Sequence, residues 1–305
     1  MTHSTKRWLV ALVFGMLILP FLFYGYLYLL RPARTDLKTT LFPGIIYQRE
    51  ARSTPRPYML HIVTIDLNAP EVGILVTPGN PMPQSGEIRA MTTSEFVKKF
   101  QLQLAINANY FGPFREEHPW DFYPHSGDKI NVIGQAISQG FVYSPPRAGW
   151  PVLCFDTNNR AQIIESGRCP DGTLQGVAGI DMLVSGGKAV KSDASDAKKP
   201  YARVAVAVGK KLWLIAVDGK QPHYSEGVTL AELSEIIVNL GAETALNLDG
   251  GGSTTMVIRD RSGVRVLNSP IHTKLPMRER PVANHLGFYV RKNPRAALTL
   301  PARKI

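Results

Sequence analysis

The sequence has little cysteine and little charge for its length. Only two of its 305 residues are cysteine, and 19% are charged. The first figure excludes a disulfide-rich scaffold, and the second excludes a highly charged disordered chain. Hydrophobic residues make up 44% of the chain, which is enough for a sizeable core in a folded domain.

Acidic residues are missing from both ends of the chain. Residues 1–34 hold four basic residues and residues 291–305 hold five, so these segments carry nine of the eleven excess positive charges. The middle is nearly neutral, which argues against a basic nucleic-acid groove and predicts no nucleic-acid partner. Basic ends of this kind favour contact with anionic lipid head groups.

No charged residue lies in the 23 positions from Trp8 to Leu30. A helix of that length rises roughly 35 Å, enough to cross a lipid bilayer with some tilt. A cleaved signal peptide is the alternative, but no small-residue cleavage site follows the apolar stretch. We therefore expect a basic head over residues 1–7 and a single-pass transmembrane anchor over residues 8–30. Basic residues flank both ends, and we expect the following domain to be extracytoplasmic.

Cys154 and Cys169 leave two interpretations open. They form one disulfide across a short loop, as suits an exported domain, or they are two buried thiols. Neither their spacing nor that of the His and Asp residues between Gly112 and Gly134 matches a metal motif. The sequence therefore predicts no metal site and no cofactor.

We expect a linker over residues 31–57, one domain over residues 58–291 and a basic tail over residues 292–305. The linker is polar and rich in proline, with a strand around Ile45–Gln48. At the start of the domain, residues 61–67 read as a strand and residues 72–77 as its return strand. The stretch from Gly112 to Gly134 has no strand or helix period, and a loop of that length is usually functional or disordered.

The last third of the domain has the clearest pattern. Residues 203–208 and 212–217 predict a hairpin around a Gly-Lys-Lys turn, and residues 244–248 predict a buried strand. Capping boxes predict two helices, the first beginning after Thr92 and the second after Thr229. Strands dominate, so we expect an α+β fold with a mixed, largely antiparallel sheet and a few flanking helices.

An acid followed by three glycines is the strongest chemical pattern. Asp249 ends the predicted strand, and a glycine run with two hydroxyl residues follows it: Gly250, Gly251, Gly252, Ser253 and Thr254. Successive N–H groups in such a turn can converge on an anion. A Walker loop is excluded because the Gly-Lys-Ser/Thr ending is missing.

Residues 247–256 resemble the signature of the phosphodiester glycosidase family. Residues 106–111, 217–220, 225–233 and 280–284 are similar to its other motifs and occur in the same order. The resemblance spans about residues 60–290 and implies hydrolysis at the anomeric carbon of a sugar whose leaving group is a phosphate ester. Bacterial members occur in envelope and exopolysaccharide contexts. The loop at 112–134 and the anchor depart from the pattern, so the sugar and the group beyond the phosphate stay open.

The resemblance, together with the chemistry of the side chains, indicates roles for individual residues. The catalytic candidates are carboxylates, Asp249 first and Asp181 second. The candidates for the phosphate and the sugar are Asn107, Asn109, Arg203, Asp218, Gly250, Gly251, Gly252, Ser253, Thr254 and Arg280. Trp120 and Tyr123 are candidates for an aromatic platform under the sugar. Turn formation, surface ion pairing and local packing are the alternative explanations for these residues.

Two functions follow from these patterns. The first is a membrane-anchored glycosidase that hydrolyses the bond between an anomeric carbon and a phosphodiester. The second is a non-catalytic binding or assembly protein for phosphorylated glycans. A structural protein of the lipid surface would leave the glycine run unexplained. The stereochemical outcome stays open, because it requires two carboxylates at a known separation.

Overall fold

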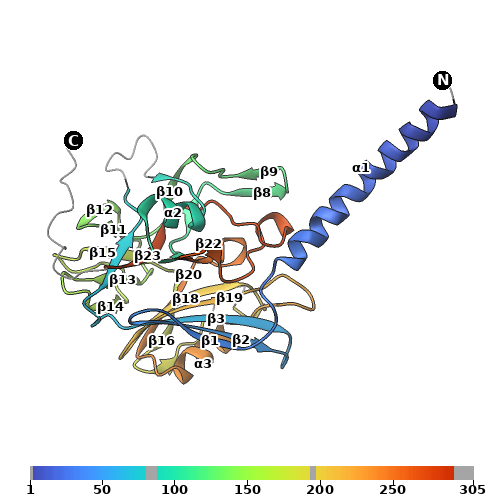
Figure 1. Cartoon of the computed structure of the whole chain (residues 1–305). Coiled ribbons are helices and arrows are strands. Elements are labelled where there is room, and N and C mark those ends of the chain that lie inside the picture. The colour runs from blue at the N-terminus through green and yellow to red at the C-terminus, as the bar shows by residue number, and fades with distance from the viewer. Residues whose placement is uncertain (1–2, 80–87, 193–196, 292–305) are drawn as a thin grey trace.

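The computed structural model describes residues 3–79, 88–192 and 197–291, with side chains of the first helix described from residue 15 (Figure 1). This part of the chain contains three α-helices: α1 (His3–Leu29), α2 (Thr93–Phe100) and α3 (Leu230–Asn239). The expected basic tail at 292–305 lies outside the described residues. Every strand pair that forms the sheets is antiparallel, so the sheet-rich α+β class is confirmed.

The largest sheet has eight strands. In spatial order these are β1 (Leu37–Phe42), β2 (Ile45–Arg52), β3 (Tyr58–Ile65), β19 (Leu212–Val217), β18 (Arg203–Val208), β20 (Thr244–Leu248), β16 (Asp181–Ser185) and β17 (Lys188–Ala189). Strands β19 and β20 both pair antiparallel with β18, so they run in the same direction. Their carboxyl ends therefore meet at one edge of the sheet, beside the start of β18.

Two five-stranded sheets and two small ones complete the fold. The second sheet is β22 (Gly263–Val266), β21 (Met256–Asp260), β6 (Leu104–Asn107), β23 (His285–Val290) and β4 (Val72–Val76). The third is β12 (Phe141–Ser144), β11 (Ala136–Ser138), β15 (Gln175–Ala178), β13 (Val152–Phe155) and β14 (Ala161–Ile164). The small ones join β5 (Ile88–Arg89), β10 (Lys129–Val132) and β7 (Phe111–Gly112), and β8 (Arg115–His118) with β9 (Asp121–Tyr123).

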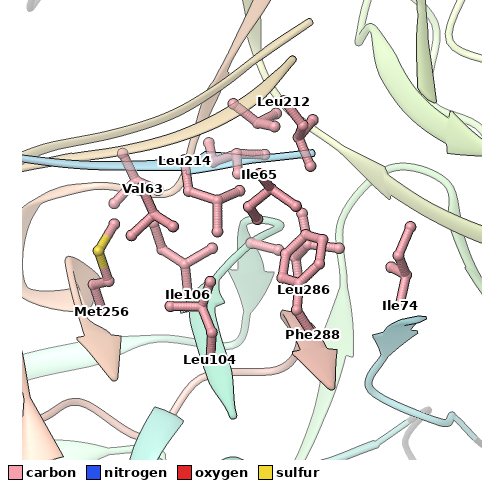
Figure 2. Close-up of a cluster of buried hydrophobic side chains, with 14 of the residues drawn as sticks. Val63, Ile65, Ile74, Leu104, Ile106, Leu212, Leu214, Met256, Leu286 and Phe288 are labelled. Atoms are coloured by element: carbon pink, nitrogen blue, oxygen red, sulfur yellow. The ribbon is translucent and has the colours of Figure 1, made fainter. Parts of the chain in front are cut away.

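The main core lies between the largest sheet and the second sheet (Figure 2). Val63 and Leu214 of the largest sheet face this core, together with Ile106, Met256 and Leu286 of the second. All five side chains are fully buried. Because successive side chains of a strand point to opposite faces, the other residues of these strands face outward towards the helices.

The helices cover the outer faces of these two sheets (Figure 1). Leu233 and Ile237 of α3 pack against the largest sheet, and Phe96 of α2 packs against the second. Both capping boxes are present, Thr92 with Glu95 and Thr229 with Glu232, and the two helices begin where the sequence predicts. The result is a layered order of helix, sheet, sheet and helix.

The predicted hairpin at residues 203–217 and the strand at residues 244–248 are confirmed residue for residue. Strands β3 and β4 are both present, but the expectation that they pair as a hairpin is wrong. Strand β3 pairs with β2 and β19, whereas β4 pairs with β23 in the second sheet. The Asn-Ala-Pro turn between them carries the chain from one layer to the next.

The segment from Gly112 to Gly134 contains three short strands and the last residue of a fourth, β7, although no strand was expected there. Strands β8 and β9 form a hairpin, and β10 pairs with β5 and β7. These strands are two to four residues long. The alternation of buried and exposed side chains that marks a strand can be recognised only over a longer run, so strands this short could not be predicted from the sequence.

The segment expected to be a linker, residues 31–57, contains β1 and β2. Strand β2 is longer than the expected Ile45–Gln48, since it pairs with β3 from Ile45 to Arg52. Ile45 and Tyr47 are buried in the core, while β1, at the sheet edge, exposes polar side chains. That exposed edge explains the polar composition that suggested a linker.

Helix α1 projects away from the sheets (Figure 1), and its described large apolar side chains from Met16 to Leu29 are mostly exposed. In the described part of the chain, no helix meets the combined length and hydropathy expected of a membrane span.

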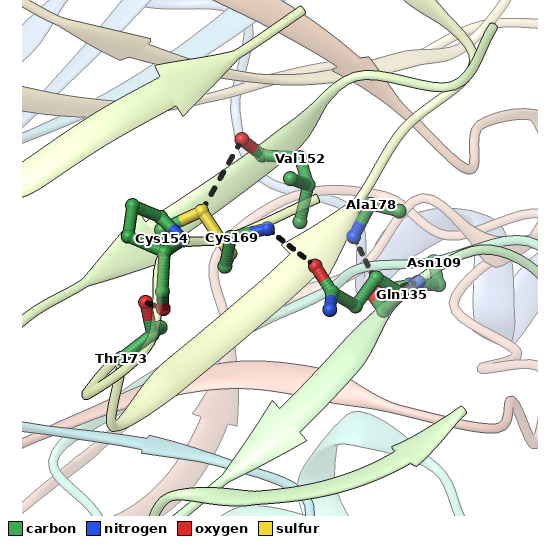
Figure 3. Close-up of a disulfide and its surroundings, with 8 residues drawn as sticks. Asn109, Gln135, Val152, Cys154, Cys169, Thr173 and Ala178 are labelled. Atoms are coloured by element: carbon green, nitrogen blue, oxygen red, sulfur yellow. Dashed lines mark hydrogen bonds between the residues drawn. A yellow bond between two sulfur atoms is a disulfide. The ribbon is translucent and has the colours of Figure 1, made fainter. Parts of the chain in front are cut away.

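Cys154 of β13 and Cys169 form a disulfide (Figure 3), with their Cα atoms 5.7 Å apart. Both cysteines are buried, and the Gln135 side chain accepts a hydrogen bond from the Cys169 N–H at 2.7 Å. Of the two interpretations that the sequence left open, the structure therefore contains the disulfide. It stabilises the third sheet and contributes no residue to the cavity described next.

Candidate active site

A cavity of about 640 Å³ opens where β20 ends. Its wall combines the glycine turn, the start of β18, the β7–β8 segment and Arg280. The lining residues are Tyr110, Phe111, Phe114, Glu116, Lys199, Tyr201, Arg203, Lys220, Asn247, Leu248, Asp249, Gly250, Gly251 and Arg280. Four cations and two carboxylates thus share one cavity, so the lining carries a net positive charge and suits an anionic ligand.

Asp249 is the carboxylate at the centre of this wall. Its main chain is fixed, because its N–H donates to the Ala108 carbonyl at 2.9 Å and its carbonyl accepts from Asn107 Nδ2 at 2.6 Å. Burial raises the pKa of the Asp249 carboxyl to about 6, against a hydrogen bond from Ser253 and the charges of Arg280 and Lys220. The side chain still keeps part of its surface open to the cavity. A carboxylate with this pKa can take up a proton near neutral pH.

The three glycines allow the turn to pack closely against its neighbours. A Cβ atom on Gly250 would lie 2.6 Å from the Ala202 carbonyl oxygen, and one on Gly252 would lie 2.3 Å from the Arg280 guanidinium. Gly251 has a positive φ of 60°, which other residues rarely adopt. Any side chain here would displace the segment before β18 or the arginine.

The N–H groups of the turn are largely occupied by protein acceptors. Gly250 donates to the Asp249 carboxylate, Gly251 to the Ala202 carbonyl at 2.8 Å, and Ser253 to the Gly250 carbonyl at 3.1 Å. The expected cradle of main-chain donors is therefore not available from these three residues. The better supported candidates for phosphate binding are therefore side chains.

Arg280 is the best supported of those ligands, and three neighbours hold it. Its Nη1 donates to Ser253 Oγ at 3.1 Å, its Nε donates to His272 Nδ1 at 3.2 Å, and its Nη2 pairs with Glu116. Phe114 stacks against its guanidinium at 4.5 Å. Ser253 also acts to lower the pKa of the Asp249 carboxyl, so its hydroxyl lies near both the carboxylate and the arginine.

Glu116 is the carboxylate that orients this arginine. Burial acts to raise the pKa of Glu116, but the His272 hydrogen bond and the Arg280 charge outweigh it and lower the pKa to about 2. Burial also lowers the pKa of His272 below its usual value. Glu116 is therefore ionised throughout the physiological range, in contrast to Asp249.

Arg203 and Lys220 supply further positive charge to the cavity. Arg203 is buried and donates to the carbonyls of Val228 and Lys199, at 3.4 and 3.2 Å. Lys220 is exposed, and its ammonium lies 4.3 Å from the centre of the Tyr201 ring. These contacts hold both cations at the cavity wall, where a phosphate group can approach them.

Asn107 and Asn109 are buried, and protein partners occupy them fully. Asn107 bonds the Asp249 carbonyl and the Thr255 N–H, and Asn109 bonds Ala178 and Asn284. Neither lines the cavity, so their contacts support a role in positioning the turn rather than in binding sugar. Asn247 does line it, and its Oδ1 is buried without a partner among the described residues.

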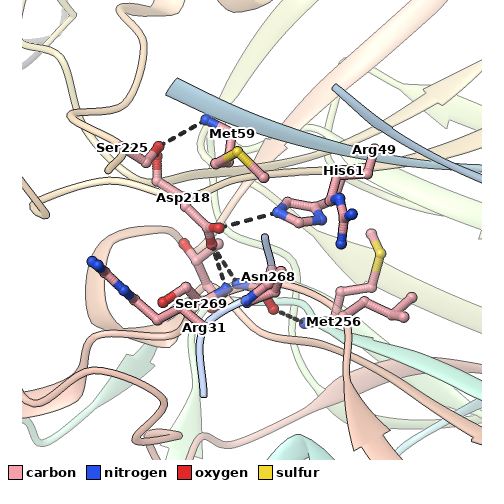
Figure 4. Close-up of polar contacts among 12 residues, drawn as sticks. Arg31, Arg49, Met59, His61, Asp218, Ser225, Met256, Asn268 and Ser269 are labelled. Carbon is pink, nitrogen blue, oxygen red and sulfur yellow. Dashed lines mark hydrogen bonds and ion pairs between the residues drawn. The ribbon is translucent and has the colours of Figure 1, made fainter. Parts of the chain in front are cut away.

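Asp218 lies in a separate buried network at the same sheet edge (Figure 4). It accepts hydrogen bonds from Asn268 and Ser269 and lies 3.0 Å from His61 Nε2. His61 in turn bonds the Tyr47 hydroxyl at 2.8 Å. Asp218 does not line the cavity, and its contacts tie the two core sheets together.

Asp181 and Thr254 also lie outside the cavity lining. Asp181 begins β16 opposite Asn247, which places it one strand away from the cavity wall. Thr254 is buried directly behind the glycine turn.

The expected aromatic platform also changes identity. Trp120 is 80% exposed and contacts His118 outside the cavity, and the Tyr123 hydroxyl donates to the Lys129 carbonyl. Four other aromatic residues line the cavity instead: Tyr110, Phe111, Phe114 and Tyr201. The aromatic loop had been identified, but which of its rings turn inward depends on the β8–β9 hairpin.

Residues that sequence reasoning did not single out are Glu116, Tyr201, Lys199 and Asn247. Only Asn247 lay within a motif. No local pattern marks Glu116, because its importance comes from Arg280, which is 164 positions away. Among the described residues, no group of three or more His, Cys, Asp or Glu side chains could hold a metal ion.

The model of one protein family, phosphodiester glycosidase, matches residues 100–289. This range is more than half of the chain and contains every residue of the cavity wall. A search of curated proteins finds no match.

Solved structures share the fold. A hypothetical protein from Synechocystis superposes with a TM-score of 0.64 at 16% identity, over 85% of this chain and only 64% of its own. The zebrafish N-acetylglucosamine-1-phosphodiester alpha-N-acetylglucosaminidase catalytic domain, auto-inhibited by its pro-peptide, has a TM-score of 0.57 at 17% sequence identity. The match covers 87% of this chain and 93% of the zebrafish chain. A putative exported protein from Burkholderia pseudomallei has a TM-score of 0.56 at 14% sequence identity, and the match covers 76% of this chain and 74% of that protein. The chain therefore belongs to the phosphodiester glycosidase family, whose model covers residues 100–289.

Proposed function

We propose that the chain hydrolyses the bond between the anomeric carbon of a sugar and a phosphodiester. The observation that carries this proposal is that Asp249, whose pKa is raised to about 6, lines the same cavity as several cations and aromatic rings. The zebrafish enzyme of similar fold is named for the same class of bond.

The charges divide the reaction between two groups of residues. Arg280, Arg203 and Lys220 stabilise the phosphate as it departs, and a phosphate needs little help from a general acid because it is a weak base. Asp249 in its ionised form accepts a proton from the attacking water or stabilises the positively charged sugar centre. Ser253 holds the carboxylate and Arg280 in register. Asn247 and the aromatic rings hold the sugar.

The direct test follows free sugar released from a panel of sugar-1-phosphodiesters. The panel includes UDP-N-acetylglucosamine and N-acetylglucosamine-1-phospho-alkyl esters, with Asp249→Asn as the matched inactive variant. Release by the unchanged protein alone supports the hydrolase. Binding of the same compounds without release by either protein would support the alternative, a non-catalytic binding or assembly protein for phosphorylated glycans.

We further propose that α1 anchors the domain to a membrane and that the domain is extracytoplasmic, acting in envelope or exopolysaccharide metabolism. The absence of charge from Trp8 to Leu30 supports the anchor, as do the exposed Phe21 and Leu29 side chains. The Cys154–Cys169 disulfide suits an oxidising compartment.

Fractionation of the native host tests this placement. The protein should stay with membranes after washing at alkaline pH, and added protease should digest its domain once the outer barriers are opened. Recovery in the soluble fraction would contradict the anchor. Protection of the domain from protease until the membrane is lysed would contradict the orientation.

A further inference from the structure

A second cavity, of about 450 Å³, adjoins the first at the base of α1. The two cavities share Glu116 and Lys220, so they are contiguous. Tyr24 and Tyr28 of α1 and Arg31, just after the helix, contribute one side, and Lys274 contributes another. We refer to this space as the helix-base pocket.

The helix-base pocket has a fixed geometry, because the end of α1 is bound to the domain. Arg31 donates to Gln221 Oε1 at 3.3 Å, and its guanidinium stacks on Tyr28 and Tyr224, 3.3 and 4.1 Å from their ring centres. The Tyr224 hydroxyl donates to the Pro32 carbonyl at 2.9 Å. The loop that holds Arg31 is the one that places Lys220 between the two cavities.

The cations of this pocket lack acidic partners. Among the described residues, no carboxylate forms an ion pair with Arg31, Lys220 or Lys274. The carboxylate that lines the pocket, Glu116, is paired with Arg280 and His272. The pocket therefore presents uncompensated positive charge beyond the site of the departing phosphate.

Backbone strain is concentrated in the same two loops. Lys220 and Lys274 both have positive φ angles, 58° and 63°, which non-glycine residues adopt at a cost. His223, Thr273 and Met277 in these loops share this conformation, so five of the eight such residues in the described chain border the helix-base pocket. Strain of this kind clusters at binding sites, where the surrounding structure maintains it.

We propose that the helix-base pocket is the leaving-group subsite and binds a second phosphate, so that the preferred substrates are sugar diphosphate esters. This proposal rests on the proposed function. The first phosphate lies in the first cavity with Arg280 and Arg203, Lys220 bridges the two, and Arg31 and Lys274 bind the second phosphate. Tyr24 and Tyr28 contact the start of the organic group attached to it.

The reaction balances with water alone. The water oxygen bonds to the anomeric carbon, and the bond from that carbon to the phosphate oxygen breaks, with its electron pair going to the diphosphate. One water proton remains on the new sugar hydroxyl, and the other passes through Asp249 to solvent. The products are a free sugar and a diphosphate monoester.

The test compares kcat/KM of the whole chain in lipid nanodiscs for N-acetylglucosamine-1-phosphate methyl ester and for the corresponding diphosphate methyl ester. The unchanged protein should prefer the diphosphate at least tenfold. Lys274→Gln should remove most of that preference while leaving the monophosphate ester within about twofold, and Lys274→Arg should restore it. Lys210→Gln, an exposed lysine in the β18–β19 turn, is the matched control.

Two results would overturn the subsite. The first is equal use of both esters by the unchanged protein, and the second is an equal loss on both with Lys274→Gln. Calorimetric binding of methyl diphosphate and methyl phosphate decides the matter independently of turnover. If neither ester is cleaved but the diphosphate binds tighter and Lys274→Gln abolishes the difference, the proposed function fails and the subsite stands.

A second pair of diphosphate substrates identifies the attached group. A preference for the dodecyl over the uridine diphosphate sugar assigns the pocket to a lipid alcohol, as the position of Tyr24 and Tyr28 on α1 favours. The reverse preference assigns it to a nucleoside. Both results retain the second phosphate as the recognised group.

Discussion

Strands β19 and β20 each run into an Asp–Gly pair at the same sheet edge, yet the two carboxylates have opposite surroundings. Asp218 is buried and accepts from Asn268 and Ser269, with His61 close by. Asp249 faces the cavity, where burial raises its pKa to about 6. Local sequence is nearly the same, so the difference comes from what the rest of the chain brings to each strand end.

The glycines of the two Asp–Gly pairs, by comparison, have the same surroundings. A Cβ on Gly219 would lie 2.3 Å from the Ala202 nitrogen, and a Cβ on Gly250 would lie 2.6 Å from the Ala202 oxygen. One segment before β18 therefore passes between both turns and needs both glycines. The backbone geometry is shared, and only the side-chain environment distinguishes the aspartate of the buried network from the one that we propose to be catalytic.

Asp249→Asn should give the largest effect. Turnover should fall by about 10³-fold or more, because the neutral amide cannot accept the proton. A carboxyl whose folded pKa is raised destabilises the fold as pH rises through that pKa, so the variant should be at least as stable at pH 7. Sugar release and thermal unfolding measure the two quantities. Full activity in this variant would remove the distinction between the two aspartates.

Asp218→Asn should act on stability instead. The amide cannot keep the bond to His61 without rearrangement, and an unsatisfied buried group costs about 1–3 kcal/mol. The free energy of unfolding from denaturant titration should fall by that amount, with kcat of the folded fraction changing less than a few fold. A large kcat loss in fully folded protein would place Asp218 in the reaction.

The acid side of the pH–rate profile sharpens the contrast further. Since Asp249 acts in its ionised form and its pKa is about 6, the rate should fall about tenfold per pH unit below that value. Glu116 cannot produce this limb, because its pKa is about 2. His272 is the other candidate, and added organic solvent separates them: it raises a carboxyl pKa but hardly moves that of an imidazolium.

The smallest effect concerns the aromatic rings. Phe114 lines the cavity and stacks on Arg280, so Phe114→Ala should raise KM by several fold to about tenfold, within the range of an exposed to partly buried cation–π contact. Trp120→Ala should change kcat/KM by less than about twofold, since Trp120 is 80% exposed outside the cavity. Equal losses in both variants would show that the β8–β9 hairpin closes over the substrate.

The sequence predicted the elements whose signals are local. The β18–β19 hairpin, strand β20 and both capping boxes depend on neighbouring residues alone, and all are present. The pairing of β3 with β19 rather than β4 depends on residues about 150 positions apart. Such pairings follow no local rule, which is why the layer change between β3 and β4 escaped prediction.

The site divides in the same way. Asp249, Arg203 and Arg280 lay in motifs and do line the cavity. The asparagines at 107 and 109 had the right chemistry, but the protein itself occupies their amides, which no motif reveals. Glu116 had no local signal, because its role comes from a contact with Arg280 across the fold.

The direct junction between α1 and the first sheet sets a limit on where this enzyme can work. Only a few residues separate Leu29 from β1, and Arg34 fastens them to the carbonyls of Tyr224 and Arg52. If α1 is held in a bilayer, as proposed, this short connection leaves the domain little freedom to move relative to the lipid surface. The cavity would then stay at a constant height above the lipid surface, so the proposed reaction would be confined to glycans attached at that surface and would exclude those attached far from it.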